Sequence, residues 1–375
     1  MYRVGVIGGG QLARMMQPAA IALGIELKVL AENPDSSAKS AASMVGDYKN
    51  LETLKAFAST VDVITFDHEH VPVDLLEEIQ RQGTAVRPSP SALIHAQNKL
   101  VMRKALAELS MPQPAWREIR NADDLIDFLE GRHSVIVKTP IGGYDGKGVR
   151  VVSTVQDVAD WLENISAYGG SLLAEEKVEF VRELSQLSAR NQSGEFSAWT
   201  LVQTVQRAGV CSEVIAPAPK SDHLERSVGI AKTISEGLGV VGVLAVEMFE
   251  DRAGNLLVNE LAMRPHNSGH FSIEGAMTSQ FEQHLRAVLD LPLGSTSLKA
   301  PYAVMLNLLG VDDKNTFVEH YPKAMAQYPN VKYHSYEKGA RVGRKMGHIT
   351  LIGDNWEELL ERGNKARQIL YGQSE

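Results

Sequence analysis

The sequence predicts a mixed protein, α/β at the start and α+β further on, and three observations support this. Strand and helix patterns alternate over residues 1–98, which is typical of a parallel, doubly wound sheet. Strand patterns joined by short turns dominate residues 99–295 and predict antiparallel sheet. Pro88-Ser89-Pro90-Ser91 and Leu291-Pro292-Leu293-Gly294 interrupt these patterns, and a small third part follows at residues 296–375.

Hydrophobic periodicity places the expected elements within these three parts. In the first part we expect strands at 4–7, 26–30 and 61–66 and a helix at 11–23. An amphipathic helix then carries Leu100, Val101, Ala105, Leu106 and Leu109 on one side. The second part should hold strands at 135–138, 149–152, 171–174, 183–190, 198–206, 240–249 and 255–260, and helices near 155–164, 222–238 and 277–290. The third should hold strands at 301–309, 331–336 and 348–352 and a helix at 356–370.

The composition is that of an ordinary globular protein with two or three domains. Of 375 residues, 44% are hydrophobic and 22% charged. The net charge of −8 gives no general attraction for nucleic acid or an anionic membrane. The single cysteine, Cys211, excludes an internal disulfide and a cysteine-based zinc cluster. The chain begins directly on a strand pattern and has no apolar run of about 18 residues, so we expect a cytoplasmic protein without a membrane or nucleic-acid partner.

A glycine-rich loop between two strand patterns is the most informative motif. The segment Gly142-Gly143-Tyr144-Asp145-Gly146-Lys147-Gly148 follows a strand that ends at Lys138. Glycines let backbone N–H groups approach phosphate oxygens, and lysines supply positive charge. A P-loop follows a strand, opens a helix and needs G-x-x-x-x-G-K-[ST], which excludes that motif here. Taken alone, the loop is either a polyphosphate cradle or a simple turn.

A second glycine motif stands at the N-terminus. The segment Gly8-Gly9-Gly10-Gln11-Leu12-Ala13 matches the dinucleotide fingerprint, and Glu32 ends the next strand where a ribose-binding acid would stand. Any anion can use the N–H groups at a helix N-terminus, so NAD or FAD, another phosphorylated ligand and a structural turn all stay open. A nicotinamide-dependent oxidoreductase leaves the polar motifs of residues 135–270 unexplained.

Two acids interrupt neighbouring core strand patterns. If the strands pair about the turn at 250–255, Glu247 and Glu260 fall nearly opposite each other, with Asn259 beside them. Facing carboxylates repel, so a shared cation would stabilise the pair. Mg²⁺ bridging ATP phosphates is the obvious ion, and Mn²⁺ could replace it. Alternatively, one glutamate points to solvent.

Three further polar segments are open to more than one interpretation. The loop Arg264-Pro265-His266-Asn267-Ser268-Gly269-His270 has a composition typical of binding. Its two histidines have the spacing of zinc ligands on a helix, but its proline and glycine disfavour a regular helix. The cluster Lys338-Gly339-Ala340-Arg341-Val342-Gly343-Arg344-Lys345-Met346-Gly347-His348 is either a solvated turn or a second phosphate site. The segment 172–178 is either surface charge or an adenine contact.

Together, these motifs resemble the ATP-grasp superfamily, and within it the N5-carboxyaminoimidazole ribonucleotide synthetases of purine biosynthesis. The resemblance covers nearly the full chain and is carried by both glycine motifs, Asn259-Glu260, the loop at 264–270 and Arg344-Lys345-Met346-Gly347-His348. It implies an ATP-grasp fold with a Rossmann-like N-terminal domain without NAD at 1–98. It further implies an ATP-grasp domain at 99–295, with a mobile central lobe at about 115–178, and a small C-terminal domain at 296–375. Members of the family are usually homodimers.

The resemblance also implies a reaction and a set of site residues. ATP would drive the joining of bicarbonate to 5-aminoimidazole ribonucleotide through carboxyphosphate, with release of ADP and phosphate. The implied ATP ligands are Lys99, Lys138, Gly142, Gly143, Tyr144, Asp145, Gly146, Lys147, Gly148, Glu175, Glu176, Lys177, Val178, Glu183, Gln206, Asn259 and Glu260. The implied ribonucleotide ligands are Gly10, Gln11, Leu12, Glu69, Tyr144, Asp145, Asn267, Ser268, Lys338 and Arg344. The implied catalytic residues are Asp145, Lys147, Arg264 and His270, and the implied metal ligands are Glu247 and Glu260.

Two other interpretations stay open, namely another ATP-grasp ligase acting on a ribonucleotide and a non-catalytic nucleotide sensor. A sensor would have no need of paired Glu247 and Glu260. Three residues depart from the family pattern. Lys99 stands where many relatives have arginine, Met263 replaces a common proline, and Gln206 occupies a position that is histidine in some members.

Overall fold

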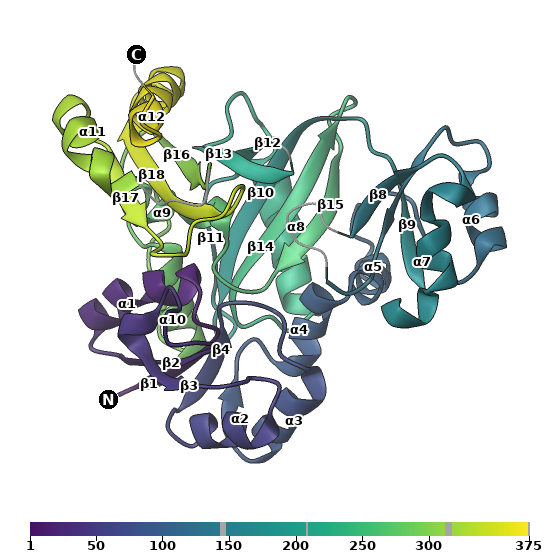
Figure 1. Cartoon of the computed structure of the whole chain (residues 1–375), viewed down its shortest axis with the longest axis horizontal. Helices are drawn as coiled ribbons and strands as arrows, with labels where there is room; N and C mark the ends of the chain where they lie inside the picture. Colours follow the sequence, from purple (N-terminus) through teal and green to yellow (C-terminus); the bar gives the residue numbers. More distant parts are fainter. Residues whose placement is uncertain (143–147, 208, 312–316, 374–375) are drawn as a thin grey trace.

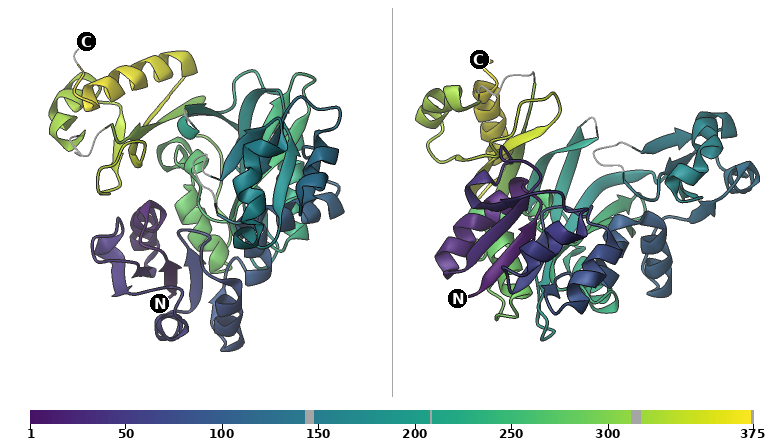
Figure 2. Two further views of the ribbon diagram at one scale, coloured as in Figure 1. Left: turned by 45° about the vertical axis from the view of Figure 1, so that its right-hand side comes forward. Right: turned by 60° about the horizontal axis from the view of Figure 1, so that its bottom comes forward.

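The computed structural model describes residues 1–142, 148–207, 209–311 and 317–373. Figure 1 shows the N-terminal domain at the lower left, a large sheet in the centre, a lobe projecting to the right and the C-terminal elements at the upper left. In the right-hand view of Figure 2 the lobe again stands off from the rest of the chain. The expected combination of α/β and α+β parts is therefore confirmed.

The N-terminal domain is a parallel sheet flanked by helices. Its strands are β1 (Arg3–Ile7), β2 (Glu26–Ala31), β3 (Ala42–Val45), β4 (Val63–Phe66) and β5 (Ala85–Val86), in the order β3-β2-β1-β4-β5. Its helices are α1 (Gln11–Leu23), α2 (Leu51–Ala58) and α3 (Val73–Arg81). The strand order reverses between β1 and β4, which is where doubly wound sheets bind ligands. The loop from Gly8 to Gly10 opens α1 at this point.

A pair of helices joins this domain to the lobe. These are α4 (Pro90–Gln97) and α5 (Lys99–Glu108). The sequence predicts a break at 88–91, but α4 begins there. Proline is well tolerated in the first turn of a helix, and Ser89 caps the helix by accepting from the N–H of Ala92 at 3.2 Å. Asn98 caps α5 in the same way.

The lobe has its own sheet and its own core. Its strands β6 (Trp116–Ile119), β7 (Val135–Lys138), β8 (Val149–Val152) and β9 (Leu172–Glu176) are antiparallel in the order β6-β9-β7-β8. Helices α6 (Ala122–Leu129) and α7 (Ala159–Glu163) belong to it. A separate hydrophobic cluster includes Phe128, Val137 and Leu172. The lobe therefore has a hydrophobic core separate from that of the large sheet.

The largest sheet runs from the middle of the chain to its end. Its strands are β10 (Phe180–Arg190), β11 (Phe196–Ala198), β12 (Val202–Arg207), β13 (Val210–Ala216), β14 (Gly242–Asp251), β15 (Leu256–Ala262), β16 (Tyr302–Leu309), β17 (Lys332–Ser335) and β18 (Lys345–Gly353). Their order is β15-β14-β10-β12-β13-β16-β18-β17, with β11 beside β10. The helices are α8 (Leu224–Gly237), α9 (Ser272–Gly275), α10 (Gln280–Val288), α11 (Tyr321–Gln327) and α12 (Trp356–Leu370).

The pairing of β13 with β16 joins the C-terminal strands to the sheet of the central part. One predicted strand at 198–206 is two strands, β11 and β12. The sequence analysis also did not foresee β3, β5, β6 or β13.

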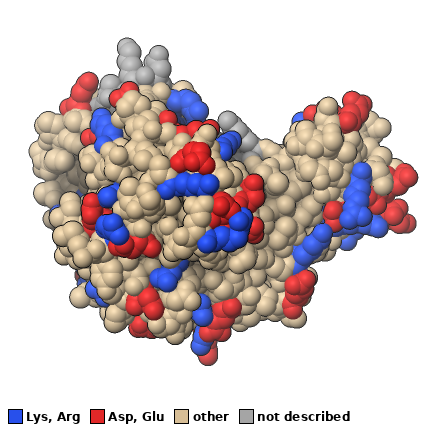
Figure 3. Space-filling view, turned by 90° about the horizontal axis from the view of Figure 1, so that it is seen from below, with Lys and Arg blue, Asp and Glu red and all other residues tan. Residues whose placement is uncertain are grey.

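None of the helices in the described ranges is long and apolar enough to cross a membrane. On the face seen in Figure 3, side chains of both charge signs are intermingled.

Candidate active site

Lys138 ends β7 just before the glycine loop, and a buried ion-pair network holds it in place. Its Nζ lies 2.6 Å from Oε2 of Glu175 on β9 and 3.3 Å from Oδ1 of Asn259 on β15. The other oxygen of Glu175 accepts from Nε of Arg103 at 2.6 Å. Arg103 is fully buried and donates at 2.8 Å to the carbonyls of Val258 and Asn259. The network therefore ties the lobe to the strand that carries Glu260.

The predicted adenine segment differs in exposure along its length. Glu175 is 3% exposed, Glu176 and Lys177 are exposed, and Val178 is partly buried. Burial raises the pKa of Glu175, but the charges of Lys138 and Arg103 outweigh it and lower the pKa below its usual value. The carboxylate of Glu175 is thus already paired with side chains of the protein. Surface charge is the wrong interpretation for this residue.

Lys99, the first residue of α5, anchors the start of the glycine loop. Its Nζ donates to the carbonyl of Gly142 at 2.9 Å, and its backbone N–H donates to that of Pro140 at 2.9 Å. Its pKa is lowered, chiefly by burial. Gly142 and Gly148 have φ of 76° and 70°, a conformation that favours glycine. The predictions for Gly143, Tyr144, Asp145, Gly146 and Lys147 lie outside the described residues.

The two predicted metal ligands face each other across a pair of strands. Glu247 of β14 and Glu260 of β15 are register partners, so the expected pairing is confirmed. Burial, together with the charge of Glu260, raises the pKa of Glu247 to about 7. His266 also contacts Glu247, with Nε2 3.2 Å from Oε1 of the carboxylate. In the described ranges, no three His, Cys, Asp or Glu side chains gather into a metal cluster.

Two more predicted ATP ligands lie on neighbouring strands. Glu183 is on β10, and burial raises the pKa of its carboxyl to about 7. It is the register partner of Thr204 on β12. Gln206 follows on β12 at an irregularity in the pairing with β13, opposite buried Cys211. By register, Glu183 of β10, Glu247 of β14 and Glu260 of β15 therefore lie on the same face of three neighbouring strands.

The predicted ribonucleotide ligands come from both ends of the chain. Nζ of Lys338 donates to Oε1 of Gln11 at the start of α1, which joins the C-terminal and N-terminal parts. Arg264 pairs with Glu69 through Nε and Oε1 at 2.7 Å. Gly10 leaves no room for a side chain, because a Cβ there would lie 2.0 Å from Oδ2 of Asp67.

The other predicted substrate residues make their hydrogen bonds inside the protein. Asn267 exchanges amide hydrogen bonds of 3.0 and 2.7 Å with Asn307, and the Ser268 hydroxyl lies 2.8 Å from that of Ser185. His270 is fully buried with Nδ1 2.8 Å from Nε2 of Gln280, and burial lowers its pKa well below the usual value. The histidine is therefore neutral. Leu12 is part of the hydrophobic core, and Arg344 donates to the carbonyl of Gly339 at 3.0 Å.

Glu32, the acid of the dinucleotide fingerprint, is engaged within its own loop. One carboxylate oxygen accepts from the N–H of Gly9 at 3.0 Å, and the other lies 3.1 Å from Nε2 of His68. Both oxygens that would accept from a ribose thus have partners in the chain.

Arg103, which the sequence analysis did not single out, lies in this site, together with His266 and Lys345, which it named only as members of polar motifs. Arg103 holds Glu175, His266 contacts Glu247, and the charge of Lys345 lowers the pKa of both Glu247 and His266. A signal existed for Arg103, which stands three residues from both Leu100 and Leu106 on the apolar side of its helix. A charge at such a position is buried only when it is paired.

The glycine-loop hairpin, the Lys138 network and the facing acids define an ATP-grasp enzyme. Three family models agree with this arrangement. The Ribonucleotide synthetase preATP-grasp domain matches residues 1–97 and the ATP-grasp domain matches residues 104–281. The Phosphoribosylaminoimidazole carboxylase C-terminal domain matches residues 303–362.

Relatives along the whole chain identify the family. The N5-carboxyaminoimidazole ribonucleotide synthase of Mycobacterium tuberculosis is 47% identical over 98% of this chain and 87% of the relative. The solved synthetase of Thermus thermophilus is 35% identical with a TM-score of 0.86, covering 99% of each chain. The Aspergillus clavatus synthase, solved with ADP and 5-aminoimidazole ribonucleotide, is 31% identical with a TM-score of 0.88, again covering 99% of each chain.

The chain belongs to the N5-carboxyaminoimidazole ribonucleotide synthase family. It is a ligase that uses ATP to carboxylate 5-aminoimidazole ribonucleotide in purine biosynthesis. The family and its reaction are thus as the sequence analysis expects.

Proposed function

We propose that bicarbonate is the source of the carboxyl group and that ATP activates it as carboxyphosphate in the site described above. The observation that carries this proposal is the position of Glu247 and Glu260 beside the Lys138 network. Bicarbonate is a poor electrophile, so a phosphoryl group must first convert one of its oxygens into a leaving group. The positive charges of the Lys138 network suit that phosphoryl transfer.

Glu247 and Glu260 fit a magnesium ion. They face each other, and burial together with the charge of Glu260 raises the pKa of Glu247, so a cation between the two carboxylates would relieve their repulsion. Mg²⁺ usually takes one or two carboxylates and completes its shell with water and substrate phosphates, so two acids are enough. When bound, the ion would neutralise charge on the phosphate oxygens of ATP. Mn²⁺ would suit the same oxygen ligands.

Lys138 and Lys99 place positive charge on the lobe side of the phosphates. Glu175 and Asn259 fix the ammonium of Lys138, which reduces the reorganisation needed when ATP binds. In the first step a bicarbonate oxygen attacks the γ-phosphorus and ADP leaves, giving carboxyphosphate. In the second step the exocyclic amine attacks the carboxyl carbon of carboxyphosphate. Phosphate leaves, and the amine loses a proton.

Arg264 is the group that we assign to bicarbonate and carboxyphosphate. Glu69 holds one side of its guanidinium, and the loop at 264–270 is fixed by buried hydrogen bonds. Neutral, buried His270 contributes to that fixed loop. Planar guanidinium groups suit carboxylate and phosphate oxygens.

The ribonucleotide would lie where the two ends of the chain meet. Lys338, in contact with Gln11, and Arg344 would bind its phosphate, and Glu69 would lie nearer the sugar and amine. From the sequence, Asp145 accepts the proton of the amine and Lys147 stabilises the transferred phosphoryl group. Retention of full kcat/KM for the ribonucleotide in Asp145→Asn would contradict that role. The homodimer and the cytoplasmic location also remain predictions.

The test is ADP release measured with and without each substrate. We expect release to require ATP, Mg²⁺, 5-aminoimidazole ribonucleotide and bicarbonate together. ADP release that does not respond to the ribonucleotide would contradict the proposed acceptor. Release unchanged after bicarbonate has been removed with degassed, CO₂-free buffer would contradict the proposed carboxyl source.

A further inference from the structure

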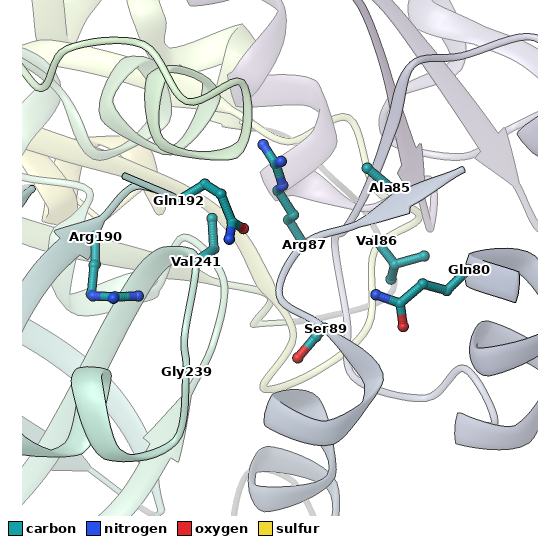
Figure 4. Close-up of a pocket in the computed structure, with 9 residues that line it drawn as sticks. All are labelled: Gln80, Ala85, Val86, Arg87, Ser89, Arg190, Gln192, Gly239 and Val241. Carbon is teal, nitrogen blue, oxygen red and sulfur yellow. The ribbon is translucent and has the colours of Figure 1, made fainter. Parts of the chain in front are cut away.

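A cavity outside the active site carries polar groups that the reaction does not use. It has a volume of about 670 Å³ and lies between the N-terminal domain and the end of β10 (Figure 4). Sites for small molecules typically have volumes of about 300–1,000 Å³. The lining residues are Gln80, Ala85, Val86, Arg87, Ser89, Arg190, Gln192, Gly239 and Val241. Two domains thus share one cavity of ligand size.

Each polar side chain of this lining can donate a hydrogen bond, although the glutamines and Ser89 can also accept one, and none of the lining residues is acidic. Two of them, Arg87 and Arg190, carry full positive charge in a chain whose net charge is −8. In Figure 4 the polar ends of Arg190 and Gln192 approach the open space from one side, and that of Gln80 approaches from the other. Such a lining suits an anion.

Arg190 supplies a second, independent observation. Its Nε is buried and has no hydrogen-bond partner among the residues that the structure describes. A buried donor without an acceptor is unfavourable, so an acceptor from outside the chain would stabilise it. Arg87 approaches from the other domain and is fixed by a 2.7 Å hydrogen bond from NH1 to the carbonyl of Val288.

Asp290, an acid whose charge interacts with Arg87, is already engaged. Its two carboxylate oxygens accept from the backbone N–H and the hydroxyl of Ser193 at 2.7 and 2.8 Å. It is not a lining residue of the cavity. An anion from solution is therefore a better match for the two guanidinium groups.

We propose that this cavity binds the phosphate group of a small molecule between Arg87 and Arg190. Guanidinium groups match phosphate oxygens with paired hydrogen bonds, and Ser89 places the N-terminal end of α4 at the same cavity. The phosphate could be inorganic phosphate, a product of the reaction, or the phosphate of a nucleoside monophosphate. Either ligand would link the N-terminal domain to the large sheet at a distance from the glycine loop.

The first experiment compares Arg190→Gln and Arg87→Gln with the wild-type protein. Melting temperature is measured against concentration of inorganic phosphate and, separately, of AMP, with ADP and Mg²⁺ held at saturation to fill the ATP site. We expect each variant to bind the phosphate probe at least about tenfold more weakly than wild type. Turnover without added phosphate should stay within about twofold. Arg190→Lys, which keeps the charge and loses the planar fork, should fall between wild type and Arg190→Gln.

The two probes distinguish the source of the phosphate. Tighter binding of AMP than of inorganic phosphate would identify a nucleoside monophosphate, and equal binding would identify the phosphate group alone. A phosphate response that is the same in all proteins would overturn the proposal. The proposal would also be overturned if the variants changed only the oligomeric mass, measured by gel filtration with light scattering. These arginines would then belong to a contact between copies of the chain.

A second measurement needs no variant. Wild-type crystals soaked in tungstate, an electron-dense oxyanion, should show density between Arg87 and Arg190. A cavity that stays empty of tungstate while the active site fills would overturn the proposal.

Discussion

Glu247→Gln should make the metal-free protein more stable at alkaline pH while it removes magnesium binding. A pKa raised from 4.5 to about 7 means that folded Glu247 keeps a proton that the unfolded chain has lost between these values. Stability therefore falls as pH rises through this window, and the full cost is present above pH 7. At about 1.4 kcal/mol per pH unit the limit is about 3 kcal/mol.

The net gain should be smaller than that limit. The side chain is 29% exposed, and the substitution also weakens the contact with His266, so we expect about 1–2 kcal/mol at pH 8. For a chain of 375 residues, an unfolding entropy of about 2.1 cal/mol/K per residue converts this gain into a rise of about 1–3 °C in Tm.

The assay is thermal unfolding in EDTA at pH 5 and pH 8. The rise should appear at pH 8 and nearly vanish at pH 5, and Mg²⁺-ATP should stabilise the wild-type protein far more than the variant. Glu250→Gln is the matched control on the same strand. Because Glu250 is ion-paired with Arg182 at 2.5 Å, its removal should lower Tm. A Glu247→Gln Tm at or below wild type at pH 8 without metal would refute the reasoning.

Three further predictions follow from the same site. Arg103→Met removes one of the two cations that pair with buried Glu175 and leaves the carbonyls of Val258 and Asn259 without their donor, so it should cost about 3–5 kcal/mol in urea unfolding and raise KM for ATP, whereas Lys104→Met at an exposed pair should cost under about 1 kcal/mol; equal costs would contradict the network. ATP should bind wild type more tightly at pH 8 than at pH 6, because Glu183, with its pKa raised to about 7, is a stronger acceptor for ribose hydroxyls when ionised, and Glu183→Gln should reduce that dependence of Kd to the part that Glu247 contributes. Lys338→Met should raise KM for the ribonucleotide about 10–100-fold with KM for ATP unchanged, and the opposite pattern would place Lys338 at the wrong substrate.

Local pattern was enough to predict the parts of the site that lie close together in sequence. Glu247 and Glu260 flank one turn, so pairing of the strands about that turn predicts them nearly opposite each other, and an irregularity in the pairing between Glu247 and Met248 makes them register partners. The alternation of strands and helices likewise predicted the N-terminal sheet. Both cases need only short-range geometry.

The rest depends on contacts between distant segments. Arg103 and Glu175 are 72 residues apart, and nothing in the local sequence of either residue shows that the two charges will form a buried pair. The pairing of Glu213 on β13 with Leu306 on β16, which joins the C-terminal strands to the large sheet, is likewise set by packing. Every residue of β13 is buried, so its sequence shows no alternation that would mark a strand.

The transfer of oxygen from bicarbonate tests the central claim most directly. With ¹⁸O-labelled bicarbonate and single turnovers fast enough to limit exchange with water, the released phosphate is analysed by mass spectrometry. If bicarbonate attacks the γ-phosphorus, one labelled oxygen per turnover should appear in phosphate, and none should appear when Glu247→Gln abolishes turnover. Unlabelled phosphate formed together with carboxylated ribonucleotide would contradict activation through carboxyphosphate.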